Sequence, residues 1–307
     1  MLQAVYFLML PNVLSLDVSG PAETLRLAGQ FRLHYISPLP QITCSIGMTL
    51  SQLQPLPERL EDNAILVIPG VSTSPGDVNH QATEQARRWL ATLQPDLQQQ
   101  HITLVCVCSG ALLAAQAGLL DNHQCTTHHD VIERLRQQAP TALVKENRIF
   151  VEDRSIYTSA GITAGIDLAL HLINRQCGAT RAMEIAREMV VYFRRSGDDP
   201  QLSPWLRYRN HLHPAVHRAQ DVMAAEPEAE WSVPQVAEKA HVSSRHLARL
   251  FRSHVGISVR EYHEQLRLAV AQQRLQQGYG LEKAALAAGF SSGRQLRRAQ
   301  QRSSMSL

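Results

Sequence analysis

Two stretches near the C-terminal end of this 307-residue chain follow the same pattern of two short helices joined by a tight turn. The first occupies residues 231–262. Ser232 is placed to cap its first helix, Gln235 can complete a capping box, and Ser243 is placed to cap its second helix. Apolar residues recur at helical spacing and would pack the two helices together: Val236, Ala237, Ala240, Leu247, Leu250 and Phe251. The pattern predicts a helix-turn-helix at about 232–253.

The second helix of this pair has a polar and basic outer face. Its outward positions are Ser244, Arg245, His246, Ala248, Arg249 and Arg252. A basic, hydrogen-bonding face opposite a buried seam is typical of a helix that enters the major groove of DNA. The helix pattern alone also fits an ordinary amphipathic pair whose arginine face is only solvated.

A second copy of the pattern favours the first interpretation. A connecting helix is expected at about 258–276, and the segment 280–302 then repeats a small apolar helix, a turn at Gly289 and Phe290, and a basic helix capped by Ser291 or Ser292. A helix of about 19 residues is about 28 Å long. This length is close to the roughly 34 Å that separates successive major grooves on one face of the duplex.

Three motifs carry a resemblance to a known family. They are S-x-R-H-L-x-R-x-F from Ser243, G-x-S-x-x-E-Y from Gly256 and A-A-x-A-A-G-F-S-S from Ala284. Together they resemble the DNA-binding domain of the AraC family of transcriptional regulators, over about the last 90 residues. The resemblance implies double-stranded DNA as partner, contacted by one set of side chains: Ser244, Arg245, His246, Arg249, Arg294, Arg297 and Arg298.

The second copy departs from the family pattern at three places. Gly280 stands where a capping Ser is usual, Gln300 stands where a core Phe is common, and the chain ends in SSMSL in place of the family's tail motif. Loss of a cap costs about 1 kcal/mol or less, and loss of a buried Phe costs more. We therefore expect the second copy to contribute less to specific binding.

Charge and composition agree with this division. Residues 215–307 carry a net charge of +5, and the rest of the chain carries −2. No apolar run approaches the roughly 20 residues of a membrane span, and the N-terminal MLQAVYFLML predicts a strand rather than a signal peptide. Five cysteines, with Cys106 and Cys108 in one apolar strand, favour reduced thiols and a cytoplasmic protein.

The first part of the chain alternates apolar strands with helical segments. Strands are predicted at 4–10, 33–37, 64–68 and 102–107, and helices at 81–93, 164–175 and 180–190. Buried strands separated by helices indicate an α/β domain, a parallel sheet with helices on both faces, ahead of an all-α C-terminal domain. The expected domains are 1–190 for ligand sensing, 191–214 as a linker and 215–307 for DNA binding.

A cysteine lies where the fourth strand meets the next helix. Cys108 and Ser109 follow Val107 and precede Gly110 and Ala111, the arrangement of a nucleophile elbow. The helix N-terminus would lower the pKa of the Cys108 thiol. Cys106, inside the strand, is interpreted as a buried structural residue.

The sequence around this elbow resembles the DJ-1/PfpI superfamily, of class I glutamine amidotransferase type. The matching motifs are V-C-S-G-A-x-L-x-A-x-A-G-L-L-D-x-x-x-x-T-T-H, ending at His128, and D-x-x-G-P-x-E from Asp17 to Glu23. The resemblance implies that Glu23 approaches Cys108, that Asp17 occupies the position of a functional aspartate of isonitrile hydratases, and that His128 lies near the same pocket.

The resemblance leaves three functions open. PfpI-type proteases carry a histidine where this chain has Ser109, so we expect a sensor rather than an enzyme, with no cofactor and no metal. The expected ligand-binding residues are Asp17, Glu23, Cys108, Ser109 and His128, whose acids favour an amine-bearing effector. A Cys108-dependent hydrolase or hydratase, with Glu23 and His128 as further catalytic residues, is the alternative. An oxidative sensor using Cys108 is a third.

Other partners follow from the same resemblance. A homodimer is expected, and RNA polymerase is a candidate for a further partner. The histidines of HLHPAVH, namely His211, His213 and His217, are interpreted as the start of a helix near Pro214 rather than as metal ligands, since no cysteine or carboxylate accompanies them closely.

Overall fold

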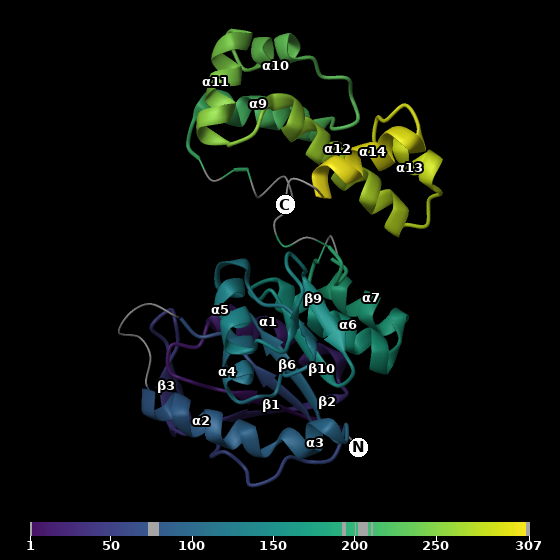
Figure 1. Ribbon diagram of the computed structural model, residues 1–307. Coiled ribbons are helices and arrows are strands. Elements are labelled where there is room, and N and C mark those ends of the chain that lie inside the picture. Colours follow the sequence, from purple (N-terminus) through teal and green to yellow (C-terminus); the bar gives the residue numbers. More distant parts are fainter. Residues whose placement is uncertain are drawn as a thin grey trace. The chain divides into compact units, whose positions relative to one another are not determined.

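The structure is a computed structural model that describes residues 2–72, 80–191, 195–199, 201, 208–209 and 211–304 (Figure 1). The chain forms two compact units, Met1–Gln201 and Leu202–Leu307. The boundary therefore lies inside the predicted linker 191–214.

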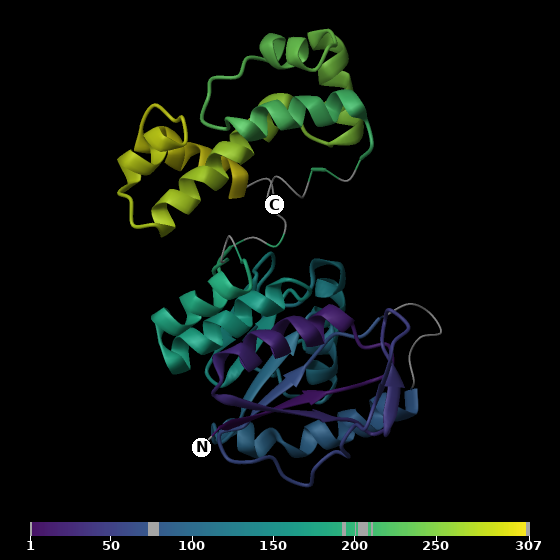
Figure 2. The same cartoon turned by 180° about the vertical axis from the view of Figure 1, so that it is seen from behind.

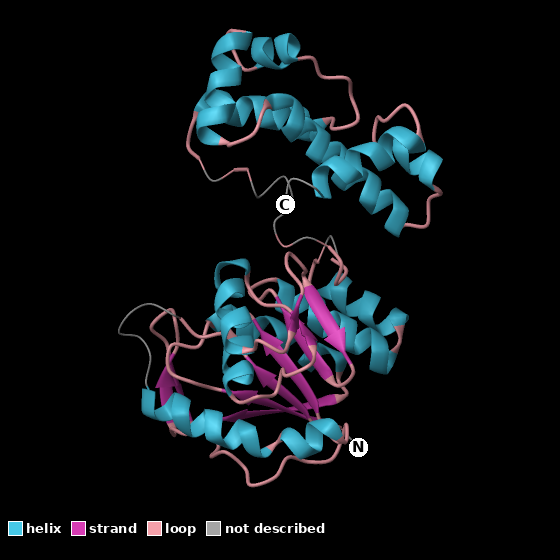
Figure 3. Ribbon diagram, in the orientation of Figure 1, coloured by secondary structure: helices cyan, strands magenta, loops and turns pink. Residues whose placement is uncertain are grey.

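Unit 1 is built on a six-stranded sheet in the order β2-β1-β5-β6-β10-β9 (Figure 3). The strands are β1 (Gln3–Leu8), β2 (Phe31–Ile36), β5 (Ile65–Ile68), β6 (Thr103–Val107), β9 (Phe150–Asp153) and β10 (Ile156–Ser159). All neighbours pair in parallel except β10 and β9, which are antiparallel. The prediction of a parallel sheet is confirmed for its centre, and β9 makes the whole sheet mixed.

Helices cover both faces of the sheet, as predicted (Figure 2). One face carries α1 (Ser15–Ala28), α6 (Ala164–Cys177) and α7 (Ala179–Glu188), and the other carries α2 (His80–Thr92), α3 (Gln94–Gln98), α4 (Gly110–Gln116) and α5 (Ile132–Gln138). Successive residues of β1 alternate between the two cores: Tyr6 and Leu8 pack on one side, and Val5 and Phe7 on the other. This is why the central strands are apolar throughout.

Two small ribbons complete unit 1. The strands β3 (Gln41–Thr43) and β4 (Thr49–Ser51) are antiparallel, and β7 (Gln124–Cys125) pairs in parallel with β8 (Leu143–Val144). The β7 ribbon brings the chain from α4 back to the carboxyl end of β6. The loop that follows β7 lies beside Cys108, because the Thr127 hydroxyl in that loop donates to Cys108 O.

Unit 2 consists of helices. They are α9 (Pro214–Ala225), α10 (Val233–Lys239), α11 (Ser244–His254), α12 (Val259–Gln276), α13 (Leu281–Ala287) and α14 (Gly293–Ser304). Two cores lie along α12: one holds Val236, Leu247, Phe251 and Tyr262, and the other holds Ala285, Phe290 and Leu296. The two predicted helix-turn-helix pairs and their connecting helix are thus present.

The start of the predicted linker packs on unit 1. The backbone N–H and guanidinium of Arg195 bind the buried carboxylate of Asp167, with Nη2 to Oδ2 at 2.6 Å. Gly197 lies so close to Phe150 that an added Cβ would come within 2.8 Å of its carbonyl oxygen. Ile149 N donates to Asp199 O at 3.0 Å. We call residues 195–199 and 201 the strap; they are part of the α/β unit rather than a free linker.

Candidate functional site

Cys108 has the backbone strain of a nucleophile elbow. Its φ is +55°, in the left-handed region that a side-chain-bearing residue rarely adopts. Its N–H donates to Ser159 O of β10 at 3.0 Å, which fixes the turn against the sheet. Gly110 completes the turn, because a Cβ there would stand 2.0 Å from Ile68 O. The prediction of a sharp turn between the strand and the helix, here β6 and α4, is confirmed.

Asp17 of α1 is the acid that meets Cys108. Its side chain is fully buried; Oδ1 accepts from Ile162 N at 2.6 Å and Oδ2 from Gly70 N at 3.1 Å. The thiol of Cys108 donates to the same carboxylate. Burial raises the pKa of Asp17, and these three donors oppose that rise. The carboxylate thus joins three segments of the chain at one point.

The surroundings of Cys108 do not favour a thiolate. Burial, followed by the charge of Asp17, raises the pKa of the Cys108 thiol to about 12. The Ser109 N–H at the start of α4 lowers it, but by less. The prediction of a lowered pKa was wrong because it considered the helix N-terminus without the buried carboxylate beside the thiol.

Glu23 does not occupy the predicted position. It lies on the exposed side of α1, where its carboxylate pairs with Arg26 at 2.6 Å, and this hydrogen bond lowers the pKa of Glu23. Asp17 and Glu23 are six residues apart, which places them about 120° apart around a helix. Only one of them can face the elbow, and the structure places Asp17 there.

The Ser109 side chain binds the backbone of Val71. Its hydroxyl accepts from Val71 N and donates to Val71 O, both at 2.9 Å. An added Cβ on Gly70 would lie 2.9 Å from the Ser109 hydroxyl oxygen and 2.5 Å from Asp17 Oδ2. Asp17, Cys108 and Ser109 are therefore close-packed, each with its polar atoms already engaged.

His128 lies in the loop after β7. The hydroxyl of the preceding Thr127 donates to Cys108 O at 2.7 Å, which ties this loop to the elbow. Burial, followed by the neighbouring His129, lowers the pKa of His128. Its Nδ1 lies 3.5 Å from Asp130 Oδ2, and no hydrogen bond or ion pair between His128 and Cys108 occurs in the described part of the chain. A base oriented on the thiol is thus not provided by this histidine.

The same loop holds a group with metal-ligand chemistry. The ligand atoms of His128, His129 and Asp130 lie within 4.8 Å of one another. These are donor types that transition metals use. His211, His213 and His217 instead take part in hydrogen bonds at the start of α9, where His213 is the N-cap residue and Pro214 the first helical residue, as predicted.

The first helix-turn-helix is formed as the sequence predicted. Ser232 and Gln235 make a reciprocal capping box, and the Ser243 hydroxyl accepts from His246 N at 3.3 Å. Leu247, Leu250 and Phe251 are buried. Arg245, Arg249 and Arg252 are exposed on the opposite face of α11, next to the half-buried Ser244 and His246, and Arg249 lies 3.1 Å from His246 Nδ1.

The second helix-turn-helix is also folded, with a different cap. Gln295 N donates to the Ser292 hydroxyl at 3.2 Å, which identifies Ser292 rather than Ser291 as the capping residue of α14. Gly280 offers α13 no side-chain cap, and Gln300 is half-buried. Arg294, Arg297 and Arg298 are exposed. The two copies therefore present basic faces on helices of 11 and 12 residues.

Comparison with known proteins decides the family of unit 1. Residues 3–175 match the model of the DJ-1/PfpI family, which is more than half of the chain. The chain belongs to the DJ-1/PfpI family. Residues 236–304 of this DJ-1/PfpI protein match a helix-turn-helix domain, which is of the AraC type.

Relatives of the DJ-1/PfpI protein span both units. It is 30% identical over 288 residues to the HTH-type transcriptional regulator GbdR of Pseudomonas aeruginosa, covering 90% of this chain and 74% of that one. The chain is also 29% identical over 187 residues to an isonitrile hydratase of Pseudomonas putida, covering 60% of this chain and 76% of that one.

A solved structure has the same fold. The crystal structure of an AraC family transcriptional regulator from Pseudomonas putida superposes with a TM-score of 0.52 at 20% identity, covering 61% of this chain and 99% of that one. Among the described residues of the DJ-1/PfpI protein, no helix combines the length and apolar character needed to cross a membrane.

Proposed function

We propose that this protein is a DNA-binding transcriptional regulator whose α/β unit binds a small, amine-bearing metabolite. The observation that carries the DNA-binding part is the pair of helix-turn-helix units, each with exposed arginines on a capped second helix, α11 or α14. The 30% identity over 288 residues to the HTH-type transcriptional regulator GbdR supports it.

We expect DNA to be contacted by side chains of α11 and α14, the second helix of each helix-turn-helix unit, which we call the recognition helices. Arg245 and Arg249 would reach base edges from α11, with Ser244 and His246 beside them. Arg294, Arg297 and Arg298 would act from α14. A bidentate arginine contact to guanine supplies about 1–3 kcal/mol of discrimination, while contacts to phosphate position the protein without specifying sequence.

The environment of the elbow supports sensing over catalysis. A hydrolase needs a nucleophile with a base oriented on it, and burial and Asp17 raise the pKa of the Cys108 thiol to about 12. Asp17, Cys108 and Ser109 are buried. Of the residues expected to hold the effector near the elbow, His128 is the one that offers a partly exposed ring.

Fluorescence anisotropy tests the DNA-binding part. The purified full-length protein is titrated onto DNA from upstream of its own gene across a salt series, with scrambled DNA of equal length as control. We expect tighter binding to the upstream fragment and a steep salt dependence that Arg249→Ala makes shallower. Equal affinity for both DNAs under all conditions would contradict the proposal.

A further inference from the structure

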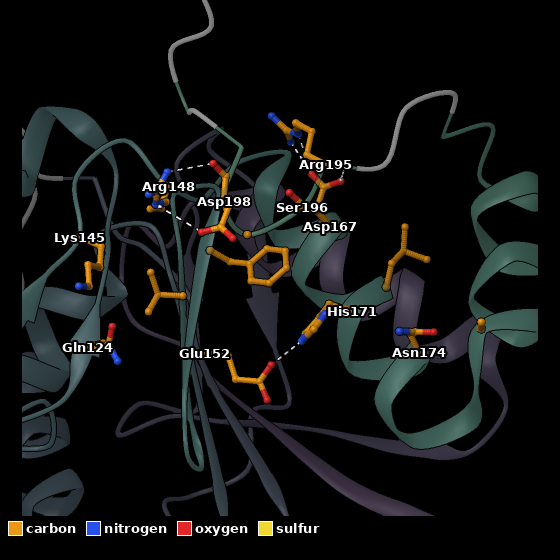
Figure 4. A pocket seen from close by; sticks show the side chains of 15 residues that line it. Gln124, Lys145, Arg148, Glu152, Asp167, His171, Asn174, Arg195, Ser196 and Asp198 are labelled. Atoms are coloured by element: carbon orange, nitrogen blue, oxygen red, sulfur yellow. Dashed lines mark hydrogen bonds and ion pairs between the residues drawn. The ribbon is translucent and has the colours of Figure 1, made fainter. Parts of the chain in front are cut away.

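Unit 1 has a pocket of about 750 Å³, whose lining residues do not include Asp17, Cys108 or Ser109 of the elbow (Figure 4). One wall is formed by β9 and α6, through Phe150, Glu152 and His171. The other wall is formed by the strap, through Ser196 and Asp198. The volume lies within the roughly 300–1,000 Å³ of small-molecule sites. The strap is thus both a wall of this pocket and the segment that leads to unit 2.

The carboxylate of Glu152 lines the pocket, where it is held by hydrogen bonds and lies among apolar lining residues. Glu152 accepts hydrogen bonds from His171 Nε2 at 2.7 Å and from the Tyr157 hydroxyl at 3.0 Å. Arg175 lies 3.4 Å from its Oε1. Burial would raise the pKa of Glu152, but the two hydrogen bonds together with the charges of His171 and Arg175 outweigh burial, and the pKa falls below its usual range. The carboxylate stays ionised and partly exposed beside Phe150 and Leu170.

The pocket also has a basic side. Lys145 and Arg148 lie on one side of the pocket, opposite His171 and Asn174 (Figure 4). Arg148 is 3.6 Å from the exposed Asp198 of the strap, and the ammonium of Lys145 has no carboxylate partner in the described part of the chain. A ligand with a negative end and a positive end could therefore pair with Lys145 at one end and with Glu152 at the other.

The strap wall is held in place at both ends. Arg195 makes its buried ion pair with Asp167 at one end. At the other end, Gln201 donates to Thr127 O at 2.7 Å and to Arg148 O at 2.9 Å, and accepts from His129 N at 2.9 Å. A ligand between β9 and the strap would therefore meet a preformed wall. Because ligand can favour only the state it binds better, binding there would favour the docked strap.

We propose that this pocket is the effector site and that it takes a small zwitterion, with a carboxylate toward Lys145 and Arg148 and an ammonium toward Glu152. The proposal rests on the proposed function, since it assumes that unit 1 senses a metabolite. Bound ligand would touch Ser196 and Asp198 and so hold the strap that precedes the DNA-binding unit. Regulation would pass through this segment.

Thermal unfolding of the full-length protein tests the site. The probes are the proteinogenic amino acids, with succinate as a purely anionic and putrescine as a purely cationic ligand. We expect at least one amino acid to raise the unfolding temperature, and neither succinate nor putrescine to match it. Lys145→Gln and Glu152→Gln should abolish the rise, while Lys145→Arg and the exposed control Glu58→Gln should keep it.

Hydrogen exchange supplies a second readout. The active amino acid should slow amide exchange in the peptide that contains residues 195–199, and Lys145→Gln should remove that protection. No thermal shift from any amino acid, or a shift that persists in both Lys145→Gln and Glu152→Gln, would overturn the proposal. A shift lost in Cys108→Ala but kept in Lys145→Gln would place the ligand at the elbow instead. Binding to the upstream DNA is measured on the same preparation, so failure of this site is distinguishable from failure of the regulator function.

Discussion

Gln201 donates through Nε2 to the carbonyl of Thr127 at 2.7 Å, and the hydroxyl of Thr127 donates to the carbonyl of Cys108 at 2.7 Å. Two hydrogen bonds thus separate the strained turn of the α/β unit from the last residue of that unit. Any change in the backbone around Cys108 has a short path to the segment that leads to the DNA-binding unit.

We predict that Gln201→Ala loosens this connection. The substitution leaves Thr127 O and His129 N without their buried partner, and an unsatisfied buried group costs about 1–3 kcal/mol. Urea unfolding should show a loss of this size for unit 1, and hydrogen exchange should accelerate in residues 126–131. Gln176→Ala, an exposed glutamine of α6, is the matched control and should change neither.

We predict that Asp17→Asn destabilises unit 1 by about 1–3 kcal/mol, because the new amide NH₂ would face one of two buried backbone N–H donors. Those donors are Ile162 N and Gly70 N. Glu23→Gln, which changes an exposed acid of the same helix, should cost less than Asp17→Asn, because exposed ion pairs contribute little to stability. Chemical denaturation measures both. A larger effect from Glu23→Gln than from Asp17→Asn would restore the original assignment of Glu23.

We predict slow alkylation of Cys108. Burial and Asp17 raise the pKa of its thiol to about 12, so the thiolate fraction should still be increasing with pH above 9. Iodoacetamide labelling followed by peptide mass spectrometry measures the rate at this residue, and Cys108→Ser identifies the peptide. Labelling that reaches its maximum rate below pH 7 would instead favour the hydrolase or hydratase alternative. Sulfenic acid formation at Cys108 would favour the oxidative sensor.

We predict unequal effects from the two recognition helices. Arg245→Ala or Arg249→Ala should abolish specific DNA binding, while Arg297→Ala should weaken it less. The half-buried Gln300 and the uncapped start of α13 are the physical reasons. Footprinting of the same fragment measures each variant. Equal loss of the footprint from both helices would argue against the asymmetry.

We predict that acid destabilises unit 2. Burial lowers the pKa of His211 and of His263, so the unfolded chain binds more protons than the folded unit below pH 6.5. The stability is present above the unfolded pKa and is lost as pH falls through the lower folded pKa. Thermal unfolding of Trp89→Phe, which removes a fluorophore of unit 1, should show a falling midpoint from pH 7 to pH 5. His263→Gln should reduce the slope.

Local features of this chain were predictable and distant ones were not. Ser232, Ser243 and Ser258 cap helices through residues three positions away, so their roles follow from spacing alone. Asp17 is fixed by Gly70 and Ile162, which are 53 and 145 residues distant in sequence. Sequence periodicity does not show contacts between residues this far apart, and the assignment of Glu23 to the elbow rested on the family resemblance alone.

The pocket was missed for a related reason. Its edge strand β9 has four residues, and the turn to β10 depends on Arg154 in the left-handed region at φ +57°. Arg148 and Glu152 lie on or next to β9, whereas His171 belongs to α6. The strap that closes the pocket has the Gly and Asp content of a linker. Only its buried contacts, such as Arg195 with Asp167, distinguish it from one.

The middle of α12 is locked to the second helix-turn-helix. Arg267 donates to Ala288 O at 3.0 Å and its guanidinium lies 4.6 Å from the centre of the Phe290 ring. With 18 residues, α12 spans about 27 Å. The distance between the two helix-turn-helix units is therefore fixed. Inserting about half a helical turn of base pairs between the two halves of the DNA site would place the second half on the far side of the duplex, where α14 could not reach it.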